Sequence, residues 1–179
     1  MAIQSLAVFC GSKSGRDPLY AEHARRLGSL LAARGVTLVY GGGSTGLMGE
    51  LADAAMNHGG RVIGIIPRLL VEWEHQHERI SELVVVDDMH TRKRNLYERS
   101  DAAVVLPGGF GTLDELFEML TWNQLAIHEK RIFFLNSGGF FEHLLRHLRR
   151  LAETGFLYDR LEDRLTMLEE PEQLDQYLL

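Results

Sequence analysis

The sequence is short of the residues on which several common classes of protein depend. Cys10 is the single cysteine among 179 residues, so an internal disulfide is excluded, and a lone thiol is typical of a reducing compartment. No stretch reaches the roughly 18 consecutive apolar residues that a membrane-spanning helix requires. The opening residues, MAIQSLAVFCGSK, lack the basic start of a secretory signal peptide. We therefore expect a cytoplasmic protein that does not work in a membrane.

Basic residues are also scarce. The lysines are Lys13, Lys93 and Lys130, and none stands in a context typical of a Schiff base, which argues against a pyridoxal enzyme. The 19 Lys and Arg residues are outnumbered by 25 Asp and Glu residues, giving a formal net charge of −6. Proteins that bind nucleic acid through its phosphates need basic surfaces, so this class is disfavoured. A small anionic ligand remains compatible, because it responds to local charge.

What the sequence does contain is an alternation of short apolar runs with longer periodic segments. Such alternation predicts right-handed crossovers and a mainly parallel sheet, and hence one doubly wound α/β domain over residues 1–179. The expected strands are 6–9, 37–40, 61–67, 83–86, 102–106, 131–135 and 165–168. The expected helices are 17–34, 46–59, 90–100, 112–126, 139–154 and a last one from Pro171. The stretch 67–82 fits neither pattern and is a candidate mobile segment.

Three glycine-rich loops follow strands of this predicted sheet. They are CGSKSG at 10–15, GGGSTGLMG at 41–49 and PGGFGT at 107–112, and each leads into a helix. Glycine lets the backbone approach a ligand closely, and a helix start offers unpaired N–H groups with the positive end of the helix dipole. Three such loops indicate a concave anion site, most simply for a phosphate. The alternative is that the glycines only form tight turns between strands and helices.

Two familiar nucleotide motifs fit the second loop poorly. GGGSTG at 41–46 formally matches G-x-G-x-x-G, but a dinucleotide site also needs an acid at the end of the next strand, which here reads IIPRLL. Gly41 and Gly46 have the spacing of a Walker loop, yet Leu47 stands where lysine is required. Neither NAD nor ATP is well supported.

Charged residues suggest how the anion site works. MHTRKRN at 89–95 places Arg92, Lys93 and Arg94 at a helix start, where successive side chains fan out and at most one or two face one site. They form either a solvated basic face or an anion clamp that uses the planar fork of arginine. Glu115, three residues after Thr112, either completes a T-x-x-E capping box or points into the pocket as a base or charge stabiliser. The sequence leaves both pairs of alternatives open.

Other candidate residues have simpler explanations. His143 and His147 lie four residues apart on a predicted helix, a spacing that suits a metal, but no third ligand is near and a surface helix explains them. Cys10 has no partner histidine in a triad pattern and fits a buried structural thiol.

The glycine loops and the basic segment together resemble the LONELY GUY (LOG) family. PGGFGTLDE at 107–115 resembles the family signature PGGxGTxxE, GGGSTGLMG at 41–49 its second glycine loop, and MHTRKR at 89–94 its M-H-x-R-K segment. CGS at 10–12 and TWNQLAIHEK at 121–130 are also similar. Motifs in consistent order are far more specific than one glycine pattern.

The resemblance implies an activity. The family hydrolyses the N-glycosidic bond of nucleoside 5′-monophosphates, including cytokinin nucleotides and AMP, to a free base and ribose 5-phosphate. It forms dimers with sites near the interface, so the resemblance also implies a homodimer. Relatives were often labelled lysine decarboxylases, a label that the few lysines here do not support.

The resemblance also implies residue roles, with Arg92 and Glu115 as the catalytic pair. The implied substrate contacts are Glu74, Lys93, Gly109, Phe110, Gly111, Thr112, Leu113, Asp114 and Thr121. On this hypothesis the glycine loops hold the 5′-phosphate, and the Glu115 carboxylate stabilises positive charge on the ribose and orients a water. Arginine is a poor literal acid, so Arg92 orients Glu115 or the substrate, or offsets charge on the leaving base. No metal or redox cofactor is required.

Two rival functions remain compatible with the sequence. One is a carrier that binds a nucleotide or molybdenum cofactor without cleaving it, although a carrier has no need of a carboxylate at the sugar. The other is a dinucleotide oxidoreductase using the loop at 41–46, which the missing acid disfavours.

Overall fold

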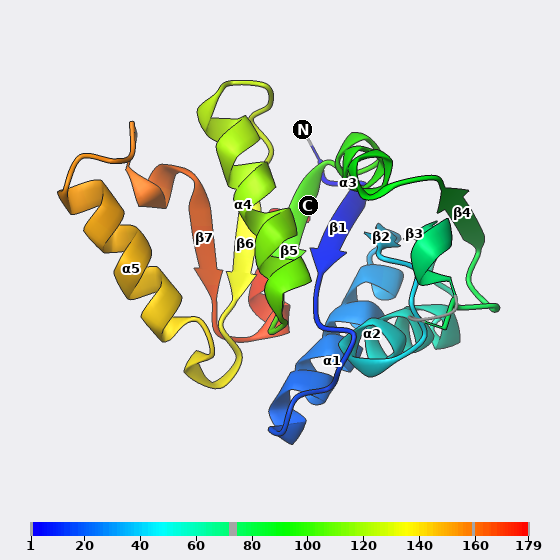
Figure 1. The fold of residues 1–179 in the computed structure, drawn as a ribbon. Helices are drawn as coiled ribbons and strands as arrows, with labels where there is room; N and C mark the ends of the chain where they lie inside the picture. Colours follow the sequence, from blue (N-terminus) through cyan, green and yellow to red (C-terminus); the bar gives the residue numbers. More distant parts are fainter. Residues whose placement is uncertain (1, 72–74, 159, 179) are drawn as a thin grey trace.

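The computed structural model describes residues 2–71, 75–158 and 160–178 (Figure 1). Seven strands form one sheet in the order β4-β3-β2-β1-β5-β6-β7, and every neighbouring pair is parallel. The strands are β1 (Ser5–Phe9), β2 (Thr37–Tyr40), β3 (Val62–Pro67), β4 (Glu82–Val86), β5 (Ala102–Val105), β6 (Ile132–Leu135) and β7 (Leu165–Leu168). The predicted α/β fold with a parallel sheet is therefore confirmed.

Helices cover both faces of this sheet. The α-helices are α1 (Pro18–Ala33), α2 (Gly46–Asn57), α3 (Met89–Glu98), α4 (Phe110–Gln124) and α5 (Glu142–Glu153). Short 3₁₀ helices are η1 (Arg68–Leu70), η2 (Ser137–Gly139), η3 (Leu161–Asp163) and η4 (Pro171–Tyr177). The predicted helix after Pro171 is thus a 3₁₀ helix, and the others match within a few residues.

The strands alternate between two cores, as the side-chain period of a strand requires. In β1, Leu6 and Val8 join the core covered by α1 and α2, whereas Ala7 and Phe9 join the core covered by α3, α4 and α5. Burial on both faces explains why the central strands read as continuous apolar runs. η4 packs onto the first core through buried Leu174.

Two helix starts follow the predicted chemistry. Asp17 caps α1 by accepting a hydrogen bond from the amide of Leu19 at 2.9 Å, and Pro18 occupies the first helical position. Asp88 caps α3 by accepting from the amide of Thr91 at 2.8 Å. The second cap fixes the helix that carries Arg92.

The connection between β3 and β4 lies against the second glycine loop where it is described. Ser44 donates its amide to the carbonyl of His75 at 2.9 Å, and His77 donates its amide to the carbonyl of Gly42 at 2.9 Å. Gly43 and Gln76 form an isolated antiparallel bridge. Residues 75–77 therefore help to shape the loop that follows β2.

Candidate active site

A cavity of about 430 Å³ opens at the carboxyl ends of the central strands. Its walls come from the three glycine-rich loops after β1, β2 and β5, from the starts of α2 and α4, and from side chains of α1 and α3. This edge is where parallel α/β sheets place their ligands. The predicted convergence of the three loops on one concave site is confirmed.

The loops are fastened to one another by backbone contacts. Gly11 donates its amide to the carbonyl of Pro107 at 3.0 Å, and Met48 donates its amide to the carbonyl of Gly11 at 3.3 Å. Gly46 has a φ of 59°, and a Cβ on it would lie 2.3 Å from the carbonyl carbon of Ser12. This glycine is needed both for its left-handed backbone and for the close approach of the first two loops.

The third loop presents the start of α4 to the cavity. Gly109 is the N-cap residue and has no side chain to cap the first turn, and Gly109, Phe110, Gly111 and Thr112 all line the cavity. The alternative of a Thr112–Glu115 capping box is wrong, because α4 begins at Phe110 and Thr112 lies inside its first turn. An uncapped helix start facing a cavity favours an anion there.

Arg92 of α3 also lines the cavity and is buried, with 5% of its surface exposed. Its Nη2 donates to the carbonyl of Gly41 at 3.0 Å, and its Nε donates to the carbonyl of Ile65 at 3.2 Å. These bonds tie α3 to the ends of β2 and β3 and fix the plane of the guanidinium. Arg94 is exposed, so the three successive cations do fan out as predicted.

Glu115 also lines the cavity, half-buried in the second turn of α4. The structure thus brings the predicted pair, Arg92 and Glu115, to one cavity from two different helices. Glu115 and the first turn of α4, whose amides attract an anion, also lie on the wall of this one cavity. A ligand that carries both a phosphate and a reacting centre would meet both features.

Lys93 lies outside this cavity. Its Nζ is 3.2 Å from Asp114 Oδ2 and 3.2 Å from Glu118 Oε1, which links α3 to α4. Burial lowers the pKa of Lys93, but the Glu118 and Asp114 carboxylates outweigh it and hold the pKa above its ordinary value. Lys93 is therefore a cation that joins the two helices bearing Arg92 and Glu115.

The remaining predicted contacts are placed as follows. Leu113, Asp114 and Thr121 are on α4 but not on the cavity wall, and the Thr121 hydroxyl donates to the carbonyl of Phe117 at 2.7 Å. Glu74 lies outside the described residues.

Several lining side chains were not singled out from the sequence. Lys13 and Ser14 come from the first loop, Tyr20 from α1 and Phe140 from the end of η2. Lys13 had a recognisable signal, since it is a cation inside a glycine loop. Tyr20 and Phe140 had none, because only the folded chain brings residues 120 positions apart to one wall. Cys10 is buried, as predicted, and lines the same cavity.

Within residues 2–71, 75–158 and 160–178, no group of three or more His, Cys, Asp and Glu side chains is arranged so that it could hold a metal ion. His143 and His147 are exposed on α5. In the same described ranges no helix has the length and apolar character needed to cross a bilayer.

The fold and the cavity define a doubly wound α/β protein with an anion-directed site at the carboxyl edge of its sheet. A family model described as "Possible lysine decarboxylase" matches residues 48–178. A cytokinin riboside 5′-monophosphate phosphoribohydrolase of Arabidopsis thaliana is 48% identical, with 85% of this chain and 70% of the relative covered. A probable enzyme of the same name from Oryza sativa subsp. japonica is 41% identical over 99% of this chain and 75% of the relative. The chain belongs to the LONELY GUY family, as its motifs predicted.

Solved structures resemble the chain in fold. A molybdenum cofactor binding protein from Rippkaea orientalis matches with a TM-score of 0.72 and 22% identity, covering 98% of this chain and 95% of that one. The molybdenum cofactor carrier protein of Chlamydomonas reinhardtii matches with a TM-score of 0.73 and 20% identity, covering 97% of both chains. At this identity the likeness shows a shared Rossmann-like architecture.

Proposed function

We propose that this protein hydrolyses the N-glycosidic bond of nucleoside 5′-monophosphates, releasing a free base and ribose 5-phosphate. The observation that carries the proposal is that one cavity holds both the uncapped start of α4 and, one turn further along the same helix, the carboxylate of Glu115. The relatives named as phosphoribohydrolases, at 41% and 48% identity, support the same reaction.

Binding of the phosphate comes first in this mechanism. The main-chain amides at Gly109–Thr112, with the positive end of the α4 dipole, hold the 5′-phosphate, and Lys13 at the cavity rim adds a positive charge. Fixing the phosphate places the ribose beside α4 and supplies binding energy remote from the reacting carbon.

Glu115 then acts at the sugar. Breaking the bond between the base and the anomeric carbon develops positive charge on the ribose, which a nearby carboxylate stabilises. The same carboxylate accepts a hydrogen bond from the attacking water and directs it to the anomeric carbon. The proton of that water leaves as the hydroxyl forms, and the departing base takes up a proton.

Arg92 stabilises the negative charge that develops on the leaving base. An arginine side chain stays protonated throughout the physiological range, so its role is electrostatic and orienting. Held by the carbonyls of Gly41 and Ile65, its guanidinium has a fixed direction toward the cavity and offsets negative charge on the leaving base. Water is the only co-reactant, so the proposed reaction needs no metal or redox cofactor.

We also propose that the protein works as a cytoplasmic homodimer. Met89 at the start of α3, Phe117 of α4, and Leu125 and Ile127 just after α4 are between 37% and 62% exposed. A contiguous apolar patch is typical of a surface that another chain covers, and we infer that these four side chains belong to one. In this proposal Lys93, Asp114 and Thr121 act next to that surface, by supporting the helices of the site. Light scattering on the purified protein tests the dimer.

The reaction is tested by incubating the purified protein with AMP and, separately, with N6-isopentenyl AMP, and following free base by chromatography. We expect equal amounts of base and ribose 5-phosphate. Adenosine is the matched control, because it has the same bond but no 5′-phosphate, and we expect little release from it. An intact nucleotide recovered with the protein after long incubation would contradict hydrolysis and indicate a carrier. Lysine with pyridoxal phosphate is a further arm, from which we expect no carbon dioxide.

A further inference from the structure

An aromatic wall closes the cavity on the side of the first glycine loop. Tyr20 of α1 and Phe140, next after η2, both line the cavity, and their rings meet edge to face with centroids 5.6 Å apart and an interplanar angle of 77°. Neither residue belongs to the motifs that identify the family. Phe140 keeps 40% of its surface exposed, although aromatic side chains gain most from burial.

Tyr20 packs directly on the loop that carries Lys13. Gly15 has a φ of 75°, and a Cβ on it would lie 2.8 Å from Cδ2 of Tyr20. The ring therefore lies against the loop backbone at the point where the loop turns toward α1. The ring therefore supports Gly15, the last of the loop residues 12–15 that line the cavity.

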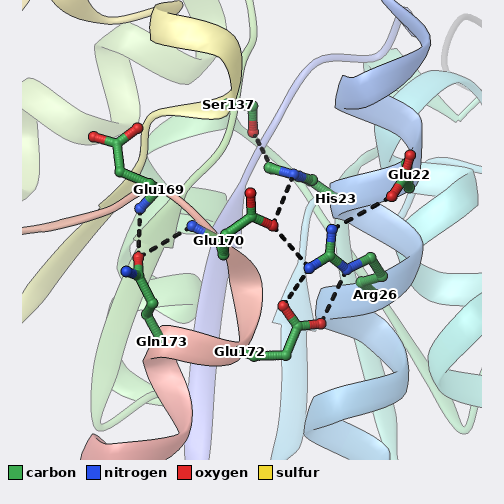
Figure 2. Close-up of polar contacts among 8 residues, drawn as sticks. All are labelled: Glu22, His23, Arg26, Ser137, Glu169, Glu170, Glu172 and Gln173. Atoms are coloured by element: carbon green, nitrogen blue, oxygen red, sulfur yellow. Dashed lines mark hydrogen bonds and ion pairs between the residues drawn. The ribbon is translucent and has the colours of Figure 1, made fainter.

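A buried hydrogen bond joins the two segments that carry the rings. Nδ1 of His23 lies 2.8 Å from Oγ of Ser137, and the two residues are 1% and 0% exposed (Figure 2). His23 follows Tyr20 by one turn of α1, and Ser137 begins η2 and accepts a hydrogen bond from the amide of Phe140 at 3.1 Å. The bond thus fixes the distance between the start of α1 and the turn after β6.

Arg26, on the same helix, and the two glutamates that it contacts do not line the cavity. Arg26, the next turn along α1, contacts Glu172 at 2.5 Å and Glu170 at 2.8 Å, and these acids belong to the C-terminal segment (Figure 2). Glu170 also lies 3.5 Å from Nε2 of His23. Arg26 therefore fastens η4 to α1, whereas the His23–Ser137 bond fastens η2 to α1.

We propose that His23 and Ser137 are positioning residues for the phosphate end of the site: their hydrogen bond holds the Tyr20–Phe140 wall against residues 12–15, and so sets where Lys13 and Ser14 meet the 5′-phosphate. This inference rests on the proposed function for the identity of the ligand. The phosphate is bound equally before and during cleavage of the glycosidic bond. The main-chain amides at the start of α4 still fix where the phosphate lies when the His23–Ser137 hydrogen bond, here called the brace, is lost. Loss of the brace therefore weakens substrate binding and changes the chemical step little.

The test compares Ser137→Ala and His23→Leu with Arg26→Gln. The brace acts on the ligand only through the loop, and an effect the size of one net hydrogen bond corresponds to about a fivefold change in affinity. We expect KM for AMP to rise by about fivefold in both brace variants, with kcat within about twofold of the wild type. The dissociation constant of ribose 5-phosphate, measured by calorimetry, rises by the same factor. Arg26→Gln lowers Tm through the C-terminal segment but leaves KM and ribose 5-phosphate binding unchanged.

Rescue separates a positioning role from general loss of stability. His23→Asn keeps an amide near the place of Nδ1 that can donate or accept, and we expect it to restore KM toward the wild-type value. If a brace variant does not fold, Phe140→Leu carries the test, because Phe140 is 40% exposed and the leucine keeps an apolar contact with Phe141 while removing the ring that packs on Tyr20. We expect the same rise in KM.

The outcomes that overturn the inference are distinct from failure of the proposed function. A fall in kcat at unchanged KM, or an equal effect of Arg26→Gln on KM, would contradict positioning at the phosphate end. If the wild type releases no base, the proposed function fails. Calorimetry with ribose 5-phosphate still decides the inference: unchanged affinity in both brace variants overturns it, and a matched loss upholds it.

Discussion

Two cavities of nearly equal size lie at opposite ends of the sheet. The candidate active site at the carboxyl ends has a volume of about 430 Å³, and a second cavity at the amino ends of β6 and β7 has a volume of about 460 Å³. The first is walled by glycine backbone, helix starts and apolar side chains. The second is walled chiefly by charged side chains: Glu129, Lys130, Arg131, Glu162, Asp163 and Arg164. Volume therefore does not distinguish them.

The two cavities differ in whether their polar groups are already bonded to other groups of the protein. In the second cavity the ammonium of Lys130 donates to the carbonyl of Tyr97 at 2.5 Å and lies over the Tyr97 ring. Arg164 donates to the carbonyl and side-chain oxygens of Asn123. The charges there join the residues just before β6 and β7 to α3 and α4, respectively. In the first cavity the start of α4 lacks a side-chain cap and faces the open space, so its donors are available to a ligand.

The largest expected effect comes from Glu115→Gln, which keeps the shape and removes the charge. We expect kcat for AMP to fall by about 10²–10⁴-fold with little change in KM or Tm, because the carboxylate acts on the transition state. Base release measured by chromatography checks it. Glu118→Gln is the matched control, since Glu118 lies on the same helix but contacts Lys93 outside the cavity. Near wild-type turnover in folded Glu115→Gln would show that the carboxylate has no role at the sugar.

Arg92→Lys should have the next largest effect. A lysine has one ammonium and cannot donate to the carbonyls of both Gly41 and Ile65 as the guanidinium does. We expect kcat/KM to fall by about 10–100-fold and Tm to decrease, because the carbonyl that loses its donor stays buried. Arg94→Lys, at an exposed position on the same helix, should change neither quantity. Equal effects of the two substitutions would mean that charge alone matters at position 92.

The architecture was predictable because its signals are local. Apolar runs, helix periodicity and caps such as Asp17 depend on neighbours in the chain, and they located the strands and most helix ends. The convergence of the three loops was also predictable, since parallel strands bring their carboxyl ends to one edge. The start of α4 was not, because TLDE satisfies the capping-box pattern while Phe110 already has helical geometry.

The parts of the site that the sequence did not predict depend on distant pairs. The ion pairs of Lys93 with Asp114 and Glu118 of the next helix had no signal in the sequence, and the contact of Lys93 with substrate stays a prediction. The packing of α3 against α4 decides this, and a single sequence gives no measure of it. The Tyr20–Phe140 wall has the same cause, since its two rings come from residues 120 positions apart in the chain.

Two glycines of the third loop differ in what surrounds them: one faces the open cavity, and the other packs against the protein. A Cβ on Gly111 would meet no atom within 4 Å, so Gly111→Ala should leave Tm unchanged and weaken AMP binding by about tenfold by occupying the cavity. A Cβ on Gly108 would lie 2.0 Å from Oγ1 of Thr112, so Gly108→Ala should cost about 1–3 kcal/mol of stability. Thermal unfolding and calorimetry with AMP check the pair. Unchanged AMP binding in Gly111→Ala would mean that the ligand does not approach the start of α4.

The smallest effect on activity is expected at His128, which is buried next to Lys130 of the second cavity but does not line that cavity. Burial, followed by the charges of Lys130 and Arg164, lowers the pKa of His128 to about 4 from an ordinary value near 6.5. Below pH 6.5 the unfolded chain therefore takes up a proton that the folded chain refuses, and the free energy of unfolding decreases until the pH falls through about 4. This proton uptake is worth about 2 kcal/mol between pH 7 and pH 5. His128→Gln removes the titration, so its Tm should fall by about 5 °C less than that of the wild type over this range. Its AMP hydrolysis at pH 7 should equal the wild-type rate. A loss of turnover in this variant would show that the charged cavity communicates with the reaction, whereas parallel Tm curves would place the acid sensitivity elsewhere in the chain.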